Sequence, residues 1–336
     1  MRIATDIDGL ERVAPRDISI TAFPAEKFAA RWKRNLHLLK AAFAADYLII
    51  HFSLIEVLFF ATLLFIVPFH RCRLVTLDFF VIAPPAWLRP IVRWSLSRID
   101  KMLVYFRDSS AFEELYGLPK GKFHYVPFKV NKFEKVLNTE VFDGEYIVVA
   151  GRSRRDFRTL FAAVQELPYP VKVLTAREQD INPHGSSLAG IACPPNVEIL
   201  YNDSDVDFFL KLMSGARLVV LPLLRGAGIQ AGIAVYLVAM ALHKCVIISE
   251  APGVSDVLLD GQAHIVPAGD PPALRDAIQQ LWQDVRLRQQ YAHAGYHYAI
   301  ALGGDDELRR SILHSVDCFT DMHVEHHDSL ASAARS

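Results

Sequence analysis

Short apolar runs alternate with helical patterns along the whole chain, and this alternation restricts the fold more than any other feature. Strand–helix alternation is typical of parallel sheets with helices on both faces. The first half predicts strands at 18–22, 47–52, 73–79, 101–106 and 124–127, with helices at about 30–44, 55–67, 87–99 and 109–116. The second half predicts strands at 146–150, 171–174, 197–200, 218–222, 245–249 and 263–266, with helices at about 156–166, 205–214, 231–242, 253–259, 271–299 and 305–319.

These two runs of alternation predict two domains. A polar, linker-like stretch at 129–144 separates them, and 336 residues suffice for two domains at about 100–200 residues each. We therefore expect an α/β protein with two Rossmann-like, doubly wound parallel-sheet domains that face a cleft. The domains would span 1–135 and 145–300, and a flexible tail would occupy 323–336.

Charge and cysteine content exclude several classes of protein. The net charge is −1 with histidine neutral, so we expect no nucleic-acid partner. The four cysteines are far apart and form no C-x-x-C pair, which argues against a disulfide framework or a zinc site and agrees with a cytoplasmic location. The first twenty residues mix acidic and basic side chains and contain no apolar core of a signal peptide.

One apolar segment, 47–69, has the length of a membrane span but carries Glu56 near its middle. A carboxylate there would cost about 2.5–3.5 kcal/mol on insertion scales. The segment is therefore interpreted as a buried strand at 47–51 followed by a core helix at 55–67, which Pro68 ends.

The two halves of the chain carry opposite net charge. Residues 1–140 contain 20 Lys and Arg against 14 Asp and Glu, whereas residues 141–336 contain 16 against 23. Within the basic half, segment 87–98 places two tryptophans and three arginines on one short amphipathic pattern, which suits a membrane interface. Two interpretations remain open. The first domain docks peripherally on anionic lipid, or the tryptophans pack in the core and the arginines are solvated.

An arginine-rich loop, Gly151-Arg-Ser-Arg-Arg155, lies between a predicted strand and a predicted helix. A glycine at a strand end lets a ligand approach the backbone, and the following helix N-terminus attracts anions. Arginine adds forked donors that suit phosphate. The alternative is a solvated surface loop, but the carboxyl end of a first strand in a doubly wound sheet favours ligand binding.

A glycine-rich segment at 221–232 and a Pro-Gly turn at 249–256 follow further along the chain. The backbone N–H groups of the first could surround a phosphate, although it completes neither a Walker sequence nor G-x-G-x-x-G. In the second, Ser255 and Asp256 are candidate caps.

In this order, the three segments resemble the donor domain of GT-B glycosyltransferases. The resemblance is to the large retaining family with an E-x7-E signature, glycosyltransferase family 4 or glycosyl transferases group 1. It covers about residues 145–300, with matching strand and helix motifs at 215–223, 238–249 and 266–278. It implies an acceptor-side domain at 1–135, a donor domain at 145–300 and a helix at 301–322 that crosses back to the first domain.

The resemblance also implies roles for individual residues. The donor diphosphate is expected at Gly151, Arg152, Arg155, Gly228 and Gly232, and the donor sugar or nucleotide at Arg225, Gln230 and Ala231. The two signature glutamates correspond to Gln230 and Val238, so the E-x7-E motif is degenerate. Asp78, at a predicted strand end, is the candidate catalytic residue on the acceptor side. Its alternative role is a capping carboxylate in a loop.

The function predicted in this way is sugar transfer from a nucleotide-sugar donor to a glycan or lipid-linked acceptor, without a cofactor or a metal. Arginine side chains and helix N-termini would stabilise the charge that develops on the leaving diphosphate. Two alternatives remain open: a catalytically impaired GT-B-like binding or scaffold protein, which Val238 favours, and a GT-B epimerase.

Overall fold

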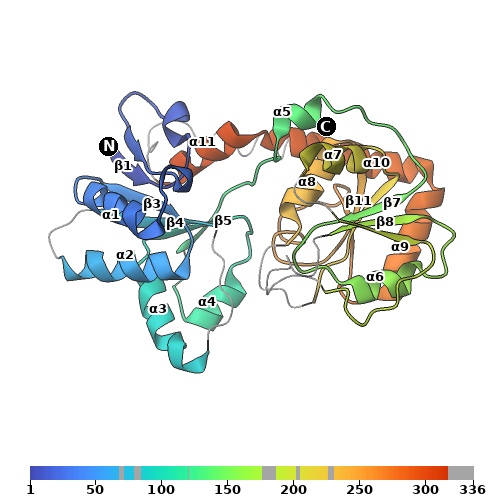
Figure 1. The fold of residues 1–336 in the computed structure, drawn as a ribbon, viewed down its shortest axis with the longest axis horizontal. Coiled ribbons are helices and arrows are strands. Elements are labelled where there is room, and N and C mark those ends of the chain that lie inside the picture. Colours follow the sequence, from blue (N-terminus) through green and yellow to red (C-terminus); the bar gives the residue numbers. More distant parts are fainter. Residues whose placement is uncertain are drawn as a thin grey trace.

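The computed structural model describes residues 1–67, 72–78, 85–119, 121–175, 187–201, 205–225 and 231–316. They form two six-stranded parallel sheets, one from each half of the chain, with helices packed against them (Figure 1). The predicted fold class, a GT-B-like α/β fold with two Rossmann-like sheets, is confirmed.

The first sheet has the strand order β2-β1-β3-β4-β5-β6. Its strands are β1 (Arg2–Thr5), β2 (Ser19–Ala22), β3 (Tyr47–His51), β4 (Arg73–Leu77), β5 (Lys101–Val104) and β6 (Phe123–Tyr125). The helices of this half are α1 (Arg31–Ala42), α2 (Leu54–Ile66), α3 (Arg89–Ser97) and α4 (Ser110–Tyr116), with short 3-10 helices at η1 (Leu10–Val13), η2 (Ala25–Lys27) and η3 (Ala86–Leu88). Strand β1, which pairs with both β2 and β3, is missing from the sequence prediction.

The second sheet has the strand order β12-β11-β10-β7-β8-β9. Its strands are β7 (Ile147–Ala150), β8 (Val171–Thr175), β9 (Val197–Tyr201), β10 (Leu218–Leu221), β11 (Cys245–Ser249) and β12 (His264–Val266). The helices that follow the first sheet are α5 (Phe133–Leu137), α6 (Phe157–Val164), α7 (Val206–Ser214), α8 (Ile233–Ala241), α9 (Pro271–Gln283), α10 (Val285–Leu302) and α11 (Asp305–Ser315).

Central strands are buried on both faces, as the continuous apolar runs predict. In β3, Tyr47 and Ile49 belong to one apolar cluster, whereas Leu48 and Ile50 belong to another. Because successive side chains of a strand point to opposite faces, both faces of the sheet are covered. The carboxyl ends of the strands are then the edge where polar residues can gather.

Two helix predictions in the second half are wrong. Residues 253–259 form turns instead of a helix. The single helix expected at 271–299 is divided at Asp284 into α9 and α10. The Asp284 carboxylate accepts a hydrogen bond from the backbone N–H of Leu287 at 2.9 Å, so it caps a new helix.

The apolar segment 47–69 forms a strand and a helix, as predicted, namely β3 and α2. Glu56 is 4% exposed and its carboxylate is hydrogen-bonded to the Arg34 guanidinium of α1, which explains a charge within so apolar a segment. Within the described ranges, no helix is both long enough and apolar enough to cross a membrane.

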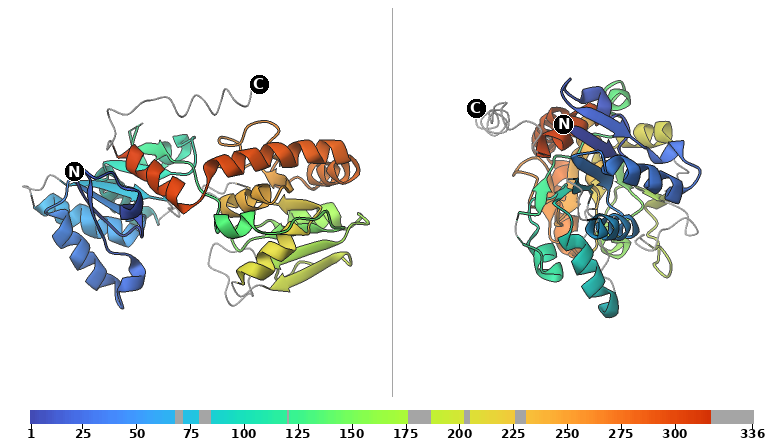
Figure 2. Two further views of the ribbon diagram at one scale, coloured as in Figure 1. Left: turned by 90° about the horizontal axis from the view of Figure 1, so that it is seen from above. Right: turned by 90° about the vertical axis from the view of Figure 1, so that its left-hand side faces the viewer.

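Helix α11 returns to the first half of the chain and packs against η1 (Figure 2). The guanidinium of Arg309 donates to the carbonyl oxygen of Asp8 at 3.0 Å, and the ammonium of Lys101 donates to the carbonyl oxygen of Ser315 at 3.3 Å. Buried Leu308, Ile312 and Leu313 join the same apolar cluster as Leu10. The end of the chain therefore completes the packing of its beginning.

Candidate functional site

A cavity of about 320 Å³ lies between the two halves of the chain. The first half contributes Asp78, Tyr105 and Phe128 to its walls. The second half contributes the loop after β7 and the start of α8, with Gly151, Arg152, Ser153, Arg155, Ala231, Gly232, Ile233, Ala234 and Val235. Six of the residues that the sequence analysis singles out therefore share one cavity.

The loop after β7 is built around a buried guanidinium. Arg155 is 3% exposed and donates to the carbonyl oxygens of Ala150 and Ser153, both at 2.9 Å. Burial lowers its pKa to about 10, so the group stays charged at neutral pH. Gly151 has φ +127°, and a Cβ there would lie 2.1 Å from Arg155 Nη2. Only glycine lets the chain pass this closely over the cation.

Arg152 has a different environment from Arg155. Its side chain is exposed and lines the cavity, whereas Arg155 is enclosed by the loop. Arg152 can therefore reach a ligand directly, and Arg155 places a fixed positive charge in the cavity wall.

The start of α8 faces the same buried cation. Gly232 precedes the helix with φ +88°, and a Cβ there would lie 3.9 Å from Arg155 Nη1. The first N–H groups of a helix have no partner within it and carry partial positive charge. This part of the cavity wall is therefore electropositive, because the Arg155 guanidinium and the N-terminus of α8 both contribute positive charge.

The other residues predicted for the donor are placed differently. Gly228 and Gln230 lie outside the described residues. Arg225 donates through Nε and Nη2 to the carbonyl oxygen of Ala268, at 3.1 and 2.7 Å, and is absent from the cavity lining. Val238 is 3% exposed and packs within the apolar core of α8. The described contacts of Arg225 are thus to the backbone of Ala268, and those of Val238 are to apolar side chains.

Asp78 follows β4 at the first-sheet side of the cavity. Its backbone has φ +63°, and its N–H donates to the carbonyl oxygen of Leu103 at 2.9 Å. Surrounding protein raises the pKa of its carboxyl group, and the charge of His51 opposes this rise. The side chain is exposed to the cavity, so it is available to a ligand.

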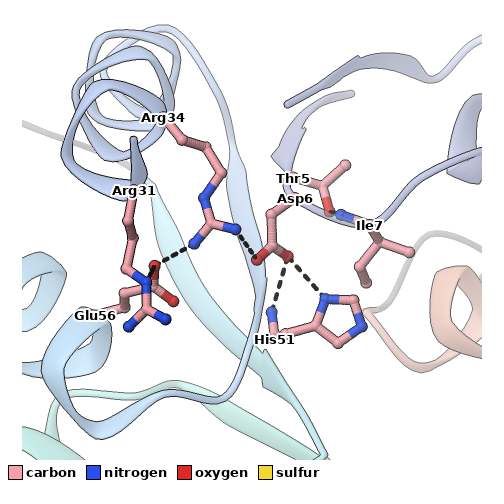
Figure 3. A network of polar contacts seen from close by, with 7 residues as sticks. All are labelled: Thr5, Asp6, Ile7, Arg31, Arg34, His51 and Glu56. Atoms are coloured by element: carbon pink, nitrogen blue, oxygen red, sulfur yellow. Dashed lines mark hydrogen bonds and ion pairs between the residues drawn. The ribbon is translucent and has the colours of Figure 1, made fainter. Parts of the chain in front are cut away.

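Sequence reasoning misses a polar network of Asp6, Arg34, His51 and Glu56 (Figure 3). Asp6, directly after β1, accepts from the backbone N–H of His51 at 2.9 Å and lies 3.2 Å from His51 Nδ1. Its other oxygen lies 3.8 Å from Arg34 Nη1, and Arg34 Nη2 donates to Glu56. The sequence shows Asp6 close to the start of the chain and His51 at the end of a predicted strand. Their contact follows only from the strand order, because β1 pairs with β3.

A carboxylate of the second half also binds the backbone of the first. Asp256 Oδ2 accepts from the N–H groups of Arg107 and Asp108, at 2.6 and 2.9 Å. Its Oδ1 accepts from the N–H of Gly253 at 2.6 Å. The residue predicted as a possible local cap therefore links the two halves of the chain.

The second half of the chain matches a known family. Residues 130–284 match the family described as glycosyl transferases group 1. No curated protein matches the chain significantly.

Solved structures of similar fold cover almost the whole chain. Anabaena HepE in complex with UDP has a TM-score of 0.66 at 14% identity, over 94% of this chain and 99% of that one. Sucrose-phosphate synthase from Thermosynechococcus elongatus has a TM-score of 0.65 at 17% identity, over 90% and 83%. A glycosyltransferase from Rickettsia africae has a TM-score of 0.60 at 12% identity, over 96% and 90%. Likeness at such identity shows the fold, so the chain has a GT-B-like fold, and its residues 130–284 are similar to the glycosyl transferases group 1 family.

Proposed function

We propose that the protein transfers a sugar from a nucleotide-sugar donor to a glycan or lipid-linked acceptor, without a metal ion. The observation that carries this proposal is the cavity between the two sheets, where exposed Arg152, buried Arg155 and the start of α8 meet. Nucleotide-sugars present a diphosphate, which is the group that such a wall attracts.

The chemistry requires charge stabilisation more than covalent help. As the glycosidic bond to the diphosphate breaks, negative charge grows on the leaving oxygen. Arg152 would contact the diphosphate directly. The Arg155 cation and the N-terminus of α8 would stabilise the negative charge of the leaving diphosphate electrostatically, without direct contact. These groups are fixed before the reaction, so they need little reorganisation.

Uridine diphosphate is the first donor nucleotide to test, because the similar Anabaena HepE structures contain UDP and UDP-glucose. Isothermal titration calorimetry should detect UDP binding, and UDP-glucose should be hydrolysed slowly or consumed when an acceptor extract is added. Absence of binding by UDP, GDP, ADP and their glucose or mannose derivatives would overturn the proposal.

The same measurements separate the alternatives. A catalytically impaired binding protein would bind the nucleotide but release no sugar from it. An epimerase would return a nucleotide-sugar of altered configuration, which NMR of the reaction products would reveal. The burial of Val238 in the core is compatible with either outcome, because it removes that position from ligand contact.

A group of exposed apolar side chains on α2, η3 and α3 concerns the membrane contact predicted from the sequence. The apolar side chains of Trp87, Ile91, Phe65 and Ile66 are 74, 48, 55 and 65% exposed. Trp87 therefore does not pack in the core. The guanidinium of Arg98 lies 4.2 Å from the centre of the Phe65 ring, which places a cation beside this apolar group.

We infer that this surface docks on anionic lipid. Arg89 and Arg93 are exposed on α3 next to its apolar residues, and each basic residue near such a surface contributes about 1 kcal/mol. Sedimentation with phosphatidylcholine–phosphatidylglycerol vesicles should retain the protein, and pure phosphatidylcholine vesicles should not.

Two variants of the surface and one control test this docking. Trp87→Ala with Ile91→Ala, and separately Arg89→Ala with Arg93→Ala, should each reduce binding. Leu259→Ala, which truncates an apolar side chain that is 58% exposed in the second half, should leave it unchanged. Equal binding by all variants would remove the docking surface.

A further inference from the structure

Two exposed histidines, His293 and His297, lie one turn apart on helix α10. Their Nε2 atoms are 3.0 Å apart, and the centres of their rings are 4.3 Å apart. Residues at positions i and i+4 of a helix lie on the same face, one above the other. The two imidazoles therefore bring the same ring nitrogen to one place on the surface.

The packing of α10 against α8 keeps this pair on the outer side of the helix. Gly295, midway between the two histidines, is buried, and a Cβ there would lie 2.9 Å from the Met240 side chain of α8 and 2.9 Å from the carbonyl oxygen of Gln262. Positions two residues before and two residues after Gly295 are rotated by about 200° around the helix axis, so they face away from α8. The close approach at Gly295 thus fixes where both imidazoles lie.

Two further rings support the pair from the side. The ring of His243, which follows α8, stacks on the ring of Tyr296 with 3.5 Å between their centres. The Tyr296 ring lies edge-on to the ring of His297, with 5.6 Å between their centres. These neighbours restrict the rotation of the His297 ring. A ligand that needs this ring in place therefore loses less side-chain entropy when it binds.

A cavity of about 550 Å³ opens beside His293. Gln289, one turn before His293, and Gln290 line this cavity together with His243, and amide oxygens accept hydrogen bonds from water. The lining also contains Arg286, which is exposed, so the solvent screens its charge. The pair therefore has room at its side for ordered water and for a ligand that carries water with it.

The distance between the two nitrogens suits a metal ion. Imidazole nitrogens bind Zn²⁺ at about 2.0–2.1 Å, so two nitrogens 3.0 Å apart would subtend an angle of about 90–100° at the ion, as adjacent ligands of one coordination shell do. Two neutral imidazoles at this distance share one hydrogen between their Nε2 atoms. An ion takes the place of that hydrogen when the donating ring adopts its other tautomer, with the hydrogen on Nδ1.

We propose that His293 and His297 bind a divalent transition-metal ion of the class that prefers imidazole, such as Zn²⁺, Ni²⁺ or Cu²⁺. Among the residues that the structure describes, no three histidine, cysteine or acidic side chains gather around one point, so water completes the coordination shell. The ion links successive turns of α10, which packs against α8 and β11, and so stabilises the second half of the chain. This site shares no described lining residue with the inter-sheet cavity, and the proposed sugar transfer does not require it.

Isothermal titration calorimetry with the chlorides of Cu²⁺, Ni²⁺, Zn²⁺ and Mg²⁺ tests the binding. Histidines outside the described residues are first replaced in every protein used, so that they cannot contribute: His323→Gln, His326→Gln and His327→Gln. One Cu²⁺ should bind more tightly than Ni²⁺ or Zn²⁺, and Mg²⁺, which prefers oxygen ligands, should not bind. His293→Gln and His297→Gln should each weaken Cu²⁺ binding at least tenfold, since loss of a group that merely supports a ligand already costs about 10- to 100-fold. His37→Gln, an exposed histidine of α1, is the matched control and should leave the affinity unchanged.

Electron paramagnetic resonance of the Cu²⁺ complex identifies the ligands directly. The spectrum should show coupling to two imidazole nitrogens, and His293→Gln should remove one of them. Thermal unfolding should shift to higher temperature as Zn²⁺ is added to the parent protein, but not when it is added to His297→Gln. No transition-metal binding, equal weakening by His37→Gln, or an unaltered copper spectrum in His293→Gln would each overturn the proposal and leave the two histidines as a hydrogen-bonded pair.

Discussion

The backbone N–H of Arg107, in the first half of the chain, is bound by the carboxylate of Asp256, in the second half, at 2.6 Å. The same oxygen accepts from Asp108, and the other from Gly253. One side chain thus connects a turn of the second half to the loop between β5 and α4. The inter-sheet cavity depends on this relative placement, because both halves contribute to its walls.

Asp256→Ala should loosen this connection. Three backbone donors would lose their acceptor, and we expect a loss of about 1–3 kcal/mol in the free energy of unfolding, measured by urea titration. Small-angle scattering should show a larger radius of gyration. Asp260→Ala, an exposed neighbour, is the control. A variant as stable and as compact as that control would contradict this role of Asp256.

Arg152→Ala should weaken nucleoside-diphosphate binding. Loss of one charge-assisted contact costs about 1.5–3 kcal/mol, which corresponds to about a 10- to 150-fold rise in Kd by calorimetry with UDP. Arg158→Ala removes an equal charge from an exposed position on α6 and should change Kd far less. Equal effects of the two substitutions would mean that only net charge matters.

Gly151→Ala should disturb the arginine-rich loop. The new methyl group would clash with the Arg155 guanidinium at a backbone angle that disfavours a side chain, and such strain costs about 1–3 kcal/mol. Thermal unfolding should therefore occur at lower temperature, with weaker UDP binding. Gly121 also has a positive φ, but a Cβ there would meet nothing within 4 Å, so Gly121→Ala measures the free-energy cost of the backbone conformation alone. If the two variants unfold at the same temperature, the contact with Arg155 contributes nothing to the loss of stability.

Lys244 should make the protein more stable in mild alkali. Its side chain is buried and donates to the carbonyl oxygen of Phe142 at 2.8 Å, and burial lowers its pKa to about 8 despite the nearby charge of Asp143. Between that value and about 10.5 the unfolded chain binds more protons than the folded one, so stability rises with pH, by up to about 3 kcal/mol.

Urea unfolding at several pH values between 7 and 10 measures this gain. Lys244→Met should abolish most of the rise, whereas Lys211→Met, at an exposed position on α7, should keep it. A rise of the same size in Lys244→Met would assign the effect to other groups.

The fold class was predictable because central strands are apolar on both faces and leave continuous runs in the sequence. Strand β1 was not, since it has only four residues and acidic side chains follow it closely. The division between α9 and α10 was also missed. The helical pattern continues across Asp284, and only its capping bond shows that a new helix begins there.

The candidate site was predictable in part. The loop at Gly151 and the start of α8 follow strand ends, and the structure brings both to one cavity. Sequence reasoning treated Arg152 and Arg155 as equivalent, because side-chain burial depends on how the loop closes over Gly151. The contact between Asp6 and His51 depends on β1 lying beside β3, which the missed strand concealed.

The packing of α11 against η1 has a consequence for synthesis of the protein. Leu10 lies near the start of the chain, and Leu308, Ile312 and Leu313 of the same apolar cluster lie near its end. A ribosome therefore completes almost the whole polypeptide before α11 is available to cover the apolar surface around Leu10. Until then the nascent N-terminal half exposes an apolar patch, and chaperones have an opportunity to bind it during translation.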